Sequence, residues 1–206
     1  MGKLILKAHE VVRLPLTMSD KEVRSVVKTE TGFSVRRLDN VTMISLMAVK
    51  RLMANNKTLP QLALYSGAEY MSVELFQSVI LAMENNEAIR PYDFIATVGN
   101  AANFYLAKEF NIQGPNIFIG ASDNTLLKAG LLAEVDMLLG HCEQAIIVIW
   151  HINDEERRCH ALLVAKASDE DVEAFKTWHY SIASAQELFV LATEGQYPLL
   201  LNLNLN

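Results

Sequence analysis

The segment from residue 124 to residue 139 constrains the fold most, because its apolar side chains are spread around a whole helix. The apolar residues of this segment leave little room for a polar face. They are Leu126, Leu127, Ala129, Leu131, Leu132, Ala133, Val135, Met137 and Leu138. A helix that is apolar on nearly all sides is buried on most of them. The fold must therefore place this helix between layers, or another chain must cover it. Gly140 is expected to end it.

Apolar periodicity and breaker residues predict the remaining elements. Further helices are expected over residues 38–54, 73–83, 100–110 and 181–193, and a short one after Ser168. Strands are expected at 3–6, 33–36, 62–66, 117–119, 145–150 and 161–166. Residues 91–98 are expected to form a loop, residues 153–158 a solvated hairpin loop, and residues 199–206 an edge strand or tail. This order predicts a single α/β layered domain over residues 1–206.

Composition narrows the class of protein. The chain has 206 residues, 51% hydrophobic residues and a net charge of −6, which favours neither nucleic-acid binding nor disorder. No apolar run is long enough for a signal peptide or a membrane span, so a cytoplasmic location is expected. The two cysteines, Cys142 and Cys159, are too few for a disulfide framework. No metal-ligand or phosphate-loop motif occurs, and no cofactor is expected.

One block of sequence carries a family resemblance. Pro91-Tyr92-Asp93-Phe94 is followed by Asn100, and then by Gly114-Pro115, a short apolar run and Gly120-Ala121-Ser122-Asp123-Asn124-Thr125. Over about residues 36–166 the chain resembles the N-terminal half of β-ketoacyl synthases, including the short synthase-like proteins of bacterial polyketide and aryl polyene pathways. The resemblance implies a thiolase-like α/β half-domain, with a mixed sheet and a buried central helix. Residues 167–206, outside the resemblance, are expected to form a C-terminal helical extension.

Asp123 stands where the resemblance places the nucleophilic cysteine. In that family the cysteine lies at a helix N-terminus, where the dipole lowers its pKa. An aspartate is a weak acyl acceptor, and its charge repels a malonyl carboxylate. As an alternative role, Asp123 lies in a sequence that suits a helix N-cap. The resemblance also implies that two catalytic histidines lie in a second half that this chain lacks; His141, His151, His160 and His179 match neither.

The two cysteines of the chain are the candidate substitutes for the missing nucleophile. Cys142 follows the C-terminal end of the long helix, where the dipole raises a thiol pKa. Cys159 follows Arg157 and Arg158, which favour a lowered pKa and a reactive thiol, against the alternative of an inert cysteine in a hairpin.

Three functions remain open from the sequence. The first is a non-condensing accessory subunit of fatty acid or polyketide synthesis, similar to a chain length factor, forming homo- or hetero-oligomers with a full-length ketosynthase and in contact with acyl carrier protein. The second is an enzyme that decarboxylates, hydrolyses or dehydrates carrier-bound acyl chains through Asp123, with Asn100, Asn124 and Thr125 holding the thioester oxygen. The third is a stand-alone acyl-binding module.

The resemblance also indicates where subunits would meet. In the synthase family the short strand after Gly-Pro pairs with its copy across a dimer axis. The expected interface residues are therefore Ile117, Phe118 and Ile119 on this strand, with Phe104 on the preceding helix.

Overall fold

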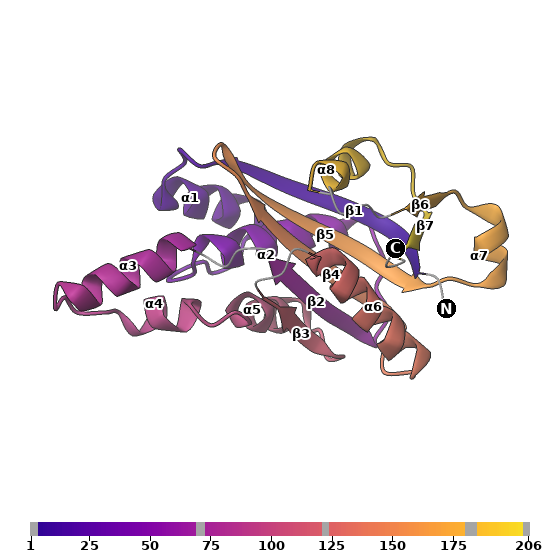
Figure 1. Cartoon of the computed structure of the whole chain (residues 1–206), viewed down its shortest axis with the longest axis horizontal. Helices are drawn as coiled ribbons and strands as arrows, with labels where there is room; N and C mark the ends of the chain where they lie inside the picture. The colour runs from indigo at the N-terminus through magenta and orange to yellow at the C-terminus, as the bar shows by residue number, and fades with distance from the viewer. Residues whose placement is uncertain (1–3, 69–72, 121–123, 180–184, 204–206) are drawn as a thin grey trace.

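The computed structural model describes residues 4–68, 73–120, 124–179 and 185–203. Among these residues, seven strands form one mixed sheet in the order β3-β2-β4-β5-β1-β7-β6 (Figure 1). The strands are β1 (Leu4–Pro15), β2 (Leu62–Ala68), β3 (Asn116–Ile119), β4 (Gln144–Ile152), β5 (Glu156–Lys166), β6 (Thr177–His179) and β7 (Leu199–Asn202). The helices are α1 (Asp20–Thr31), α2 (Asn40–Ala54), α3 (Val73–Glu84), α4 (Pro91–Ala96), α5 (Ala101–Phe110), α6 (Thr125–Leu138), α7 (Asp169–Ala174) and α8 (Ala185–Glu194).

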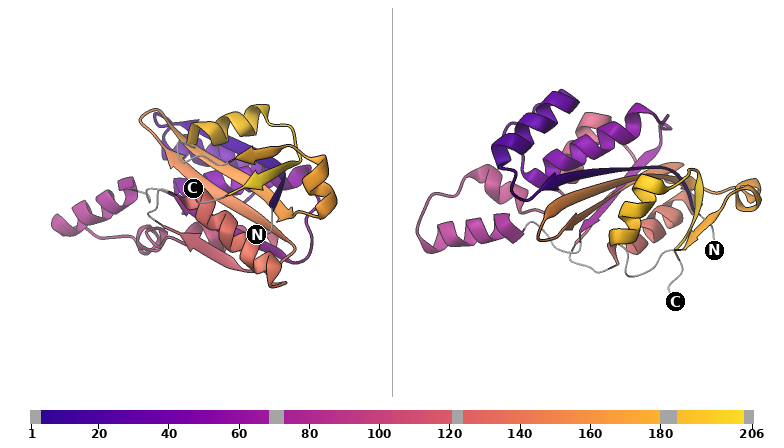
Figure 2. Two further views of the ribbon diagram at one scale, coloured as in Figure 1. Left: turned by 45° about the vertical axis from the view of Figure 1, so that its right-hand side comes forward. Right: turned by 90° about the horizontal axis from the view of Figure 1, so that it is seen from above.

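Helices cover the sheet on both faces, so the expected α/β layering is confirmed (Figure 2). Helices α1, α2 and α5 lie on one face, and α6 and α8 lie on the other. Strands β2 and β3 run parallel to β4, whereas β5 and β1 continue the sheet in antiparallel pairs. Helices α3 and α4 form an arm that projects from the body.

Helix α2 follows directly from its sequence. The Asp39 side chain accepts a hydrogen bond of 2.6 Å from the backbone N–H of Thr42 and caps the first turn. The helix is almost completely covered from Thr42 to Val49, because β1 and β5 lie on one side and α1 and α5 on the other.

The central helix α6 is packed against the sheet but keeps one apolar stripe exposed. Leu126, Ala129, Ala133 and Met137 are buried together with residues of β2, β4 and β5. The exposed stripe consists of Leu132, Val135, Leu138 and Leu139, the last of which follows the helix. The prediction of burial on most sides is therefore correct for the sheet side alone, and Gly140, at φ 78°, ends the helix as expected.

The C-terminal residues supply much of the cover for α6. Leu188 and Leu191 of α8, and Leu199, Leu201 and Leu203, belong to the same buried cluster as α6. A side chain at Gly130 would collide with the end of the Leu203 side chain, so any larger residue there would force Leu203 to move.

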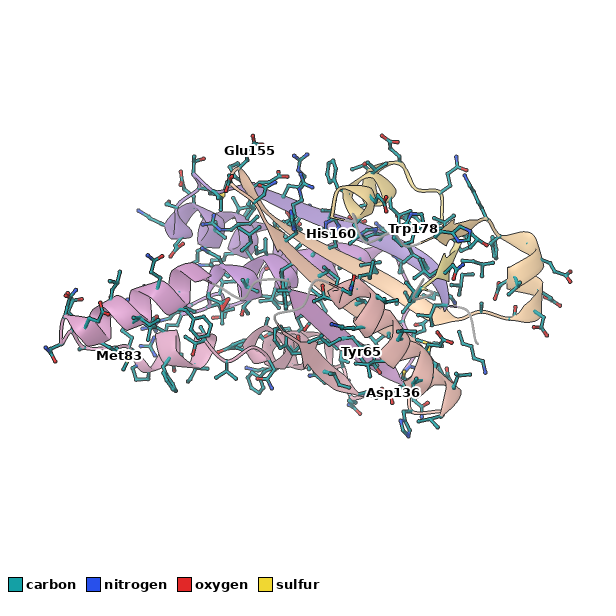
Figure 3. The ribbon with its side chains drawn as sticks, in the orientation of Figure 1. Tyr65, Met83, Asp136, Glu155, His160 and Trp178 are labelled. Carbon is teal, nitrogen blue, oxygen red and sulfur yellow. The ribbon has the colours of Figure 1, made fainter. Side chains whose placement is uncertain are left out.

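A hydrogen-bonded group fixes the C-terminal end of α6 to the sheet. The hydroxyl of Tyr65 on β2 donates to Asp136 of α6, and His141 Nδ1 lies 2.8 Å from the other Asp136 oxygen (Figure 3). The Tyr65 side chain is fully buried. Hydrogen bonds from Tyr65 and His141 lower the pKa of Asp136.

Several sequence expectations were wrong. Residues 33–36 form no strand, and β1 extends to Pro15 rather than ending near residue 6. Residues 91–96 form helix α4, because Pro91 suits the first helical position. The hairpin loop is shorter than expected, since Glu156, Arg157 and Arg158 are buried within β5. Strand β7 lies between β1 and β6 and is not at the edge of the sheet.

Candidate functional site

The predicted site centres on the start of α6. Asp123 lies outside the described residues, so its proposed roles are not tested by the structure. Thr125, the first residue of α6, is buried over the C-terminal end of β2. A Cβ atom at Gly67 would lie only 2.9 Å from the Thr125 Cβ, so the helix starts in direct contact with the strand. The N-terminus of α6 is thereby fixed at the C-terminal end of β2.

Asn124 and Asn100 each precede a helix, but neither side chain caps it. The Asn124 side-chain oxygen is shielded from solvent and has no hydrogen-bond partner among the described residues. Asn100 is exposed at the start of α5, on the other face of the sheet from α6. Within the described part of the chain, no hydrogen bond joins Asn100 to Asn124 or Thr125. Their shared role around a thioester oxygen stays a prediction.

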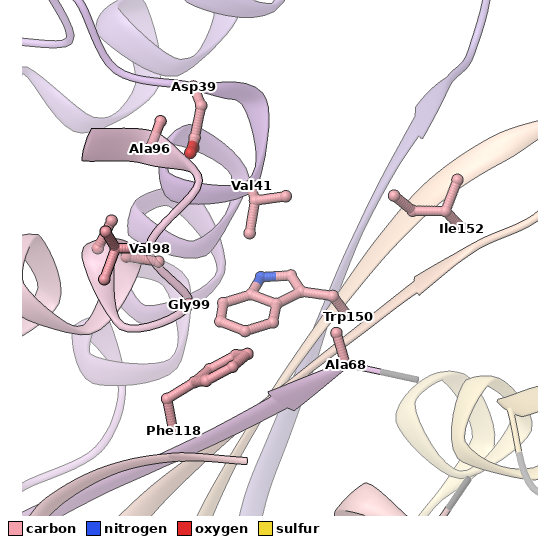
Figure 4. A pocket seen from close by; sticks show the side chains of 11 residues that line it. Asp39, Val41, Ala68, Ala96, Val98, Gly99, Phe118, Trp150 and Ile152 are labelled. Carbon is pink, nitrogen blue, oxygen red and sulfur yellow. The ribbon is translucent and has the colours of Figure 1, made fainter. Parts of the chain in front are cut away.

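Phe118 on β3 packs against the core on the face of the sheet that carries α5. Its ring occupies the space that side chains at Gly99 and Gly120 would need, so a larger residue at either position would force the ring to move. The ring also faces Trp150, with centroids 6.1 Å apart, beside a cavity of about 20 Å³ (Figure 4). The Trp150 indole N–H donates to Ser45 Oγ at 2.6 Å, which fixes the opposite wall. Phe118 is thus half-buried against the core and serves to position β3.

Strand β3 forms one edge of the sheet and pairs with β2 alone among the described strands. Ile117 and Ile119 are half-buried. Phe104 on the neighbouring helix α5 is 63% exposed. An open edge strand beside an exposed aromatic side chain is the kind of surface that pairs with another chain.

A polar network holds α5 against this edge. The Ser66 hydroxyl on β2 donates to the Asn103 side-chain oxygen, and Asn103 Nδ2 donates to the Asn116 side-chain oxygen at 2.8 Å. Ser66 and Asn103 are both almost completely buried. These bonds join α5, β2 and β3, and so set where Phe104 and the β3 edge lie relative to each other.

A buried histidine pair was missed by the sequence analysis, which assigned His160 no partner and did not consider His9. His9 Nε2 on β1 lies 3.1 Å from His160 Nδ1 on β5. Burial lowers the pKa of His160 to about 3 and that of His9 well below its ordinary value, so both are neutral at pH 7. His160 pairs with Ile149, which pairs with Gly67, so the histidines share the sheet face that carries the start of α6. The sequence could have indicated this pair through the alternation of side chains between the two faces of each strand. That pattern does not show which strands are neighbours, and the two histidines are 151 residues apart in sequence.

Charged residues continue this cluster toward the end of the sheet. Glu156 accepts hydrogen bonds from Arg158 and, at 2.8 Å, from Arg13 Nε. Both guanidinium groups lie over the Phe189 ring of α8, at 4.4 and 4.8 Å from its centroid. The two arginines lower the pKa of Glu156 against the opposing effect of burial. The network fastens α8 over β1 and β5.

Neither cysteine is activated. Burial raises the pKa of Cys159 to about 12, and the side chain lies on the sheet face opposite Arg158. The alternative of an inert Cys159 is therefore favoured, because the thiol is completely buried and faces away from Arg158. Burial also raises the pKa of Cys142. Both thiols are free.

Searches of the described residues for two other kinds of site gave negative results. They contain no group of three or more side chains placed to hold a metal ion. They also contain no helix with the length and apolar character needed to cross a bilayer.

Comparisons with known proteins identify the fold. Neither protein-family models nor curated protein sequences gave a match. Among solved structures, a ketosynthase (ApeO) in complex with its chain length factor (ApeC) from Xenorhabdus doucetiae matches with a TM-score of 0.62 and 13% identity, over 82% of this chain and 81% of that chain. The ishigamide ketosynthase/chain length factor matches with a TM-score of 0.63 and 15% identity, over 81% of this chain and 63% of that chain.

A third structure, a type II polyketide synthase acyl-carrier protein in complex with its ketosynthase, matches with a TM-score of 0.53 and 13% identity. That match covers 84% of this chain and 65% of the other, so in two of the three cases this chain spans less than two thirds of its neighbour. At such identities the shared property is the fold. This chain therefore has the thiolase-like fold of ketosynthase and chain-length-factor structures.

Proposed function

We propose that this chain is a non-condensing, ketosynthase-like subunit that binds a full-length ketosynthase and acts as a chain-length-factor-like accessory in fatty acid or polyketide synthesis of the aryl polyene type. The observation that carries the proposal is the match with a chain in a ketosynthase and chain length factor complex. Coverage is nearly equal on both sides, 82% and 81%, so that chain is about as long as this one. Chains of this size and fold thus occur in such complexes.

The surface of the molecule supports a role through protein contact. The open edge of β3 has the exposed Phe104 beside it on α5, while α6 keeps an exposed apolar stripe on the other face of the sheet. Apolar surface of this kind on a protein with a well-buried core is typical of subunit interfaces. We place the ketosynthase contact at the edge formed by β3 and α5.

The sequence supports the absence of condensing activity. Asp123 stands at the position that the resemblance gives to the nucleophilic cysteine, and Cys142 and Cys159 are buried thiols with raised pKa values. A thiol with a raised pKa carries little thiolate at pH 7 and is a poor acyl acceptor. The alternative of an enzyme that acts through Asp123 has no specific observation in its favour.

The test is the product distribution of the partner ketosynthase. A full-length ketosynthase from the same cell would be assayed with its acyl carrier protein, with and without this chain. The proposal predicts products of a defined length only when the chain is present. If the chain acts only by binding the ketosynthase, Asp123→Asn is expected to leave the product distribution unchanged. A product distribution altered by Asp123→Asn would favour the hypothesis that the chain acts on acyl chains through Asp123.

A matched pair of variants locates the interface. Phe104 on α5 and Phe94 on α4 are exposed to the same extent, 63% and 62%, but Phe94 lies on the projecting arm. Phe104→Ser is expected to weaken ketosynthase binding, and Phe94→Ser to leave it unchanged. Equal effects of the two variants, or an effect of Phe94→Ser alone, would place the contact elsewhere.

A further inference from the structure

A wide cleft separates the arm of α3 and α4 from the body at the start of α2. Its volume is about 940 Å³, within the range of small-molecule sites. Five arginines line it: Arg24 of α1, Arg36 and Arg37 before α2, Arg90 before α4, and Arg157 of β5. The cleft lies on the side of the sheet that carries α1 and α2, and so is separate from the start of α6.

The charge of the cleft is opposite to that of the whole chain. Its lining carries five arginines and three aspartates, Asp20, Asp39 and Asp93, which gives 5 − 3 = +2. The chain as a whole carries −6. A local reversal of sign in a concave site concentrates ligands of the opposite charge.

Two of the three carboxylates in the cleft have neutral donors as partners. Asp39 accepts from the backbone N–H of Thr42, and Asp20 accepts from Asn40 Nδ2 at 2.7 Å. Burial raises the pKa of Asp39, which reduces its tendency to carry a charge. Two of the three aspartates are thus used to fix the loop and the start of α2.

Four of the five arginines line the cleft without a carboxylate partner among the described residues. Arg24 donates to the backbone oxygen of Leu38 at 3.2 Å, and the Arg37 guanidinium lies 4.8 Å from the centroid of the Tyr92 ring. Across the described ranges, Arg24, Arg36, Arg37 and Arg90 form no ion pair with a carboxylate. Arg157 is 7% exposed and donates to the backbone oxygen of Pro15 at 3.4 Å.

The backbone at Arg37 adds an independent indication. The φ angle of Arg37 is 66°, in the left-handed region that residues other than glycine, asparagine and aspartate rarely adopt. Backbone strain of this kind is concentrated at functional sites. Here it directs the Arg37 side chain into the cleft against Tyr92.

We propose that this cleft binds a small molecule carrying a phosphate or diphosphate group. Guanidinium groups bind phosphate oxygens through paired N–H donors, and a phosphate ester supplies about two negative charges and three acceptor oxygens. Several arginines without carboxylate partners match such a group better than they match a single carboxylate. The apolar side chains of Val41, Leu75 and Ile152 also line the cleft and provide a surface for the rest of the ligand.

The proposal does not depend on ketosynthase binding and is tested on the chain alone. Calorimetric titration with inorganic pyrophosphate, against sodium chloride at the same ionic strength, is expected to show saturable binding. Inorganic phosphate is expected to bind more weakly at the same site. The double variant Arg36→Gln, Arg90→Gln removes two exposed guanidinium groups of the cleft.

This variant is expected to raise the dissociation constant for pyrophosphate at least tenfold, equivalent to about 1.4 kcal/mol. The control, Lys108→Gln with Lys166→Gln, removes the same charge from exposed positions outside the cleft and is expected to change affinity less than twofold. Circular dichroism and thermal melting would show that both variants fold. Binding no tighter than that of chloride, or equal losses in both double variants, would overturn the proposal.

Discussion

The buried network of Ser66, Asn103 and Asn116 predicts a double-mutant cycle with a specific outcome. Ser66 is 0% exposed and Asn103 is 1% exposed, so neither finds water when its partner is removed. Asn103→Leu keeps the volume of the side chain but leaves the Ser66 hydroxyl without its acceptor. Leaving one buried polar group unpaired costs about 1–3 kcal/mol. Ser66→Ala alone leaves the Asn103 oxygen unpaired and is expected to cost a similar amount.

The double variant Ser66→Ala, Asn103→Leu removes both buried groups together. Asn116 is exposed and can bond to water, so no buried polar group is left unpaired by this change. Its cost should therefore be smaller than the sum of the single costs by about 1–3 kcal/mol. Urea denaturation at pH 7 measures all three differences. Additivity within about 0.5 kcal/mol would refute the reasoning, because it would mean that the two side chains do not depend on each other.

Two further predictions concern α6. Because hydrogen bonds lower the pKa of Asp136, its carboxylate contributes stability that is present above the ordinary pKa of 3.8 and lost as the pH falls through the lower folded-state value. Asp136→Asn should therefore flatten the dependence of the urea midpoint on pH below about 4, and an unchanged acid dependence would contradict the assignment of Tyr65 and His141 as its partners. Asp123→Cys is expected to give no condensation if, as proposed, the chain supplies no catalytic histidine pair. Condensation of acyl and malonyl groups on carrier proteins by this variant, measured by mass spectrometry, would contradict the proposal.

The elements predicted best were those whose local signals agree with their packing. Helix α2 has apolar residues at helical spacing and an aspartate at its cap, and strand β4 contains a continuous apolar run over residues 145–150. Helix α1 was missed because only Val23, Val27 and Thr31 are buried on it. A signal was nevertheless present, since Ser19 and Glu22 form a capping box.

The remaining features depend on contacts between distant segments. Strand β1 contains Lys7, His9, Glu10 and Arg13, which interrupt its apolar pattern. His9 is nonetheless buried beside His160, and Arg13 pairs with Glu156 from β5. The cleft between α2 and the arm brings Arg36 and Arg37 close to Arg90, more than fifty residues later in the chain. No local sequence pattern indicates that these distant residues are neighbours, because only the fold brings them together.

The most direct test of the proposed function is the mass in solution of this chain co-purified with a full-length ketosynthase. Light scattering after size-exclusion chromatography is expected to show one hetero-oligomer of defined composition. The complex should be lost with Ile117→Asp, because a carboxylate on the edge strand β3 opposes pairing with another chain. Two proteins that elute at their separate masses, or a complex unaffected by Ile117→Asp, would contradict an accessory subunit that acts through this edge.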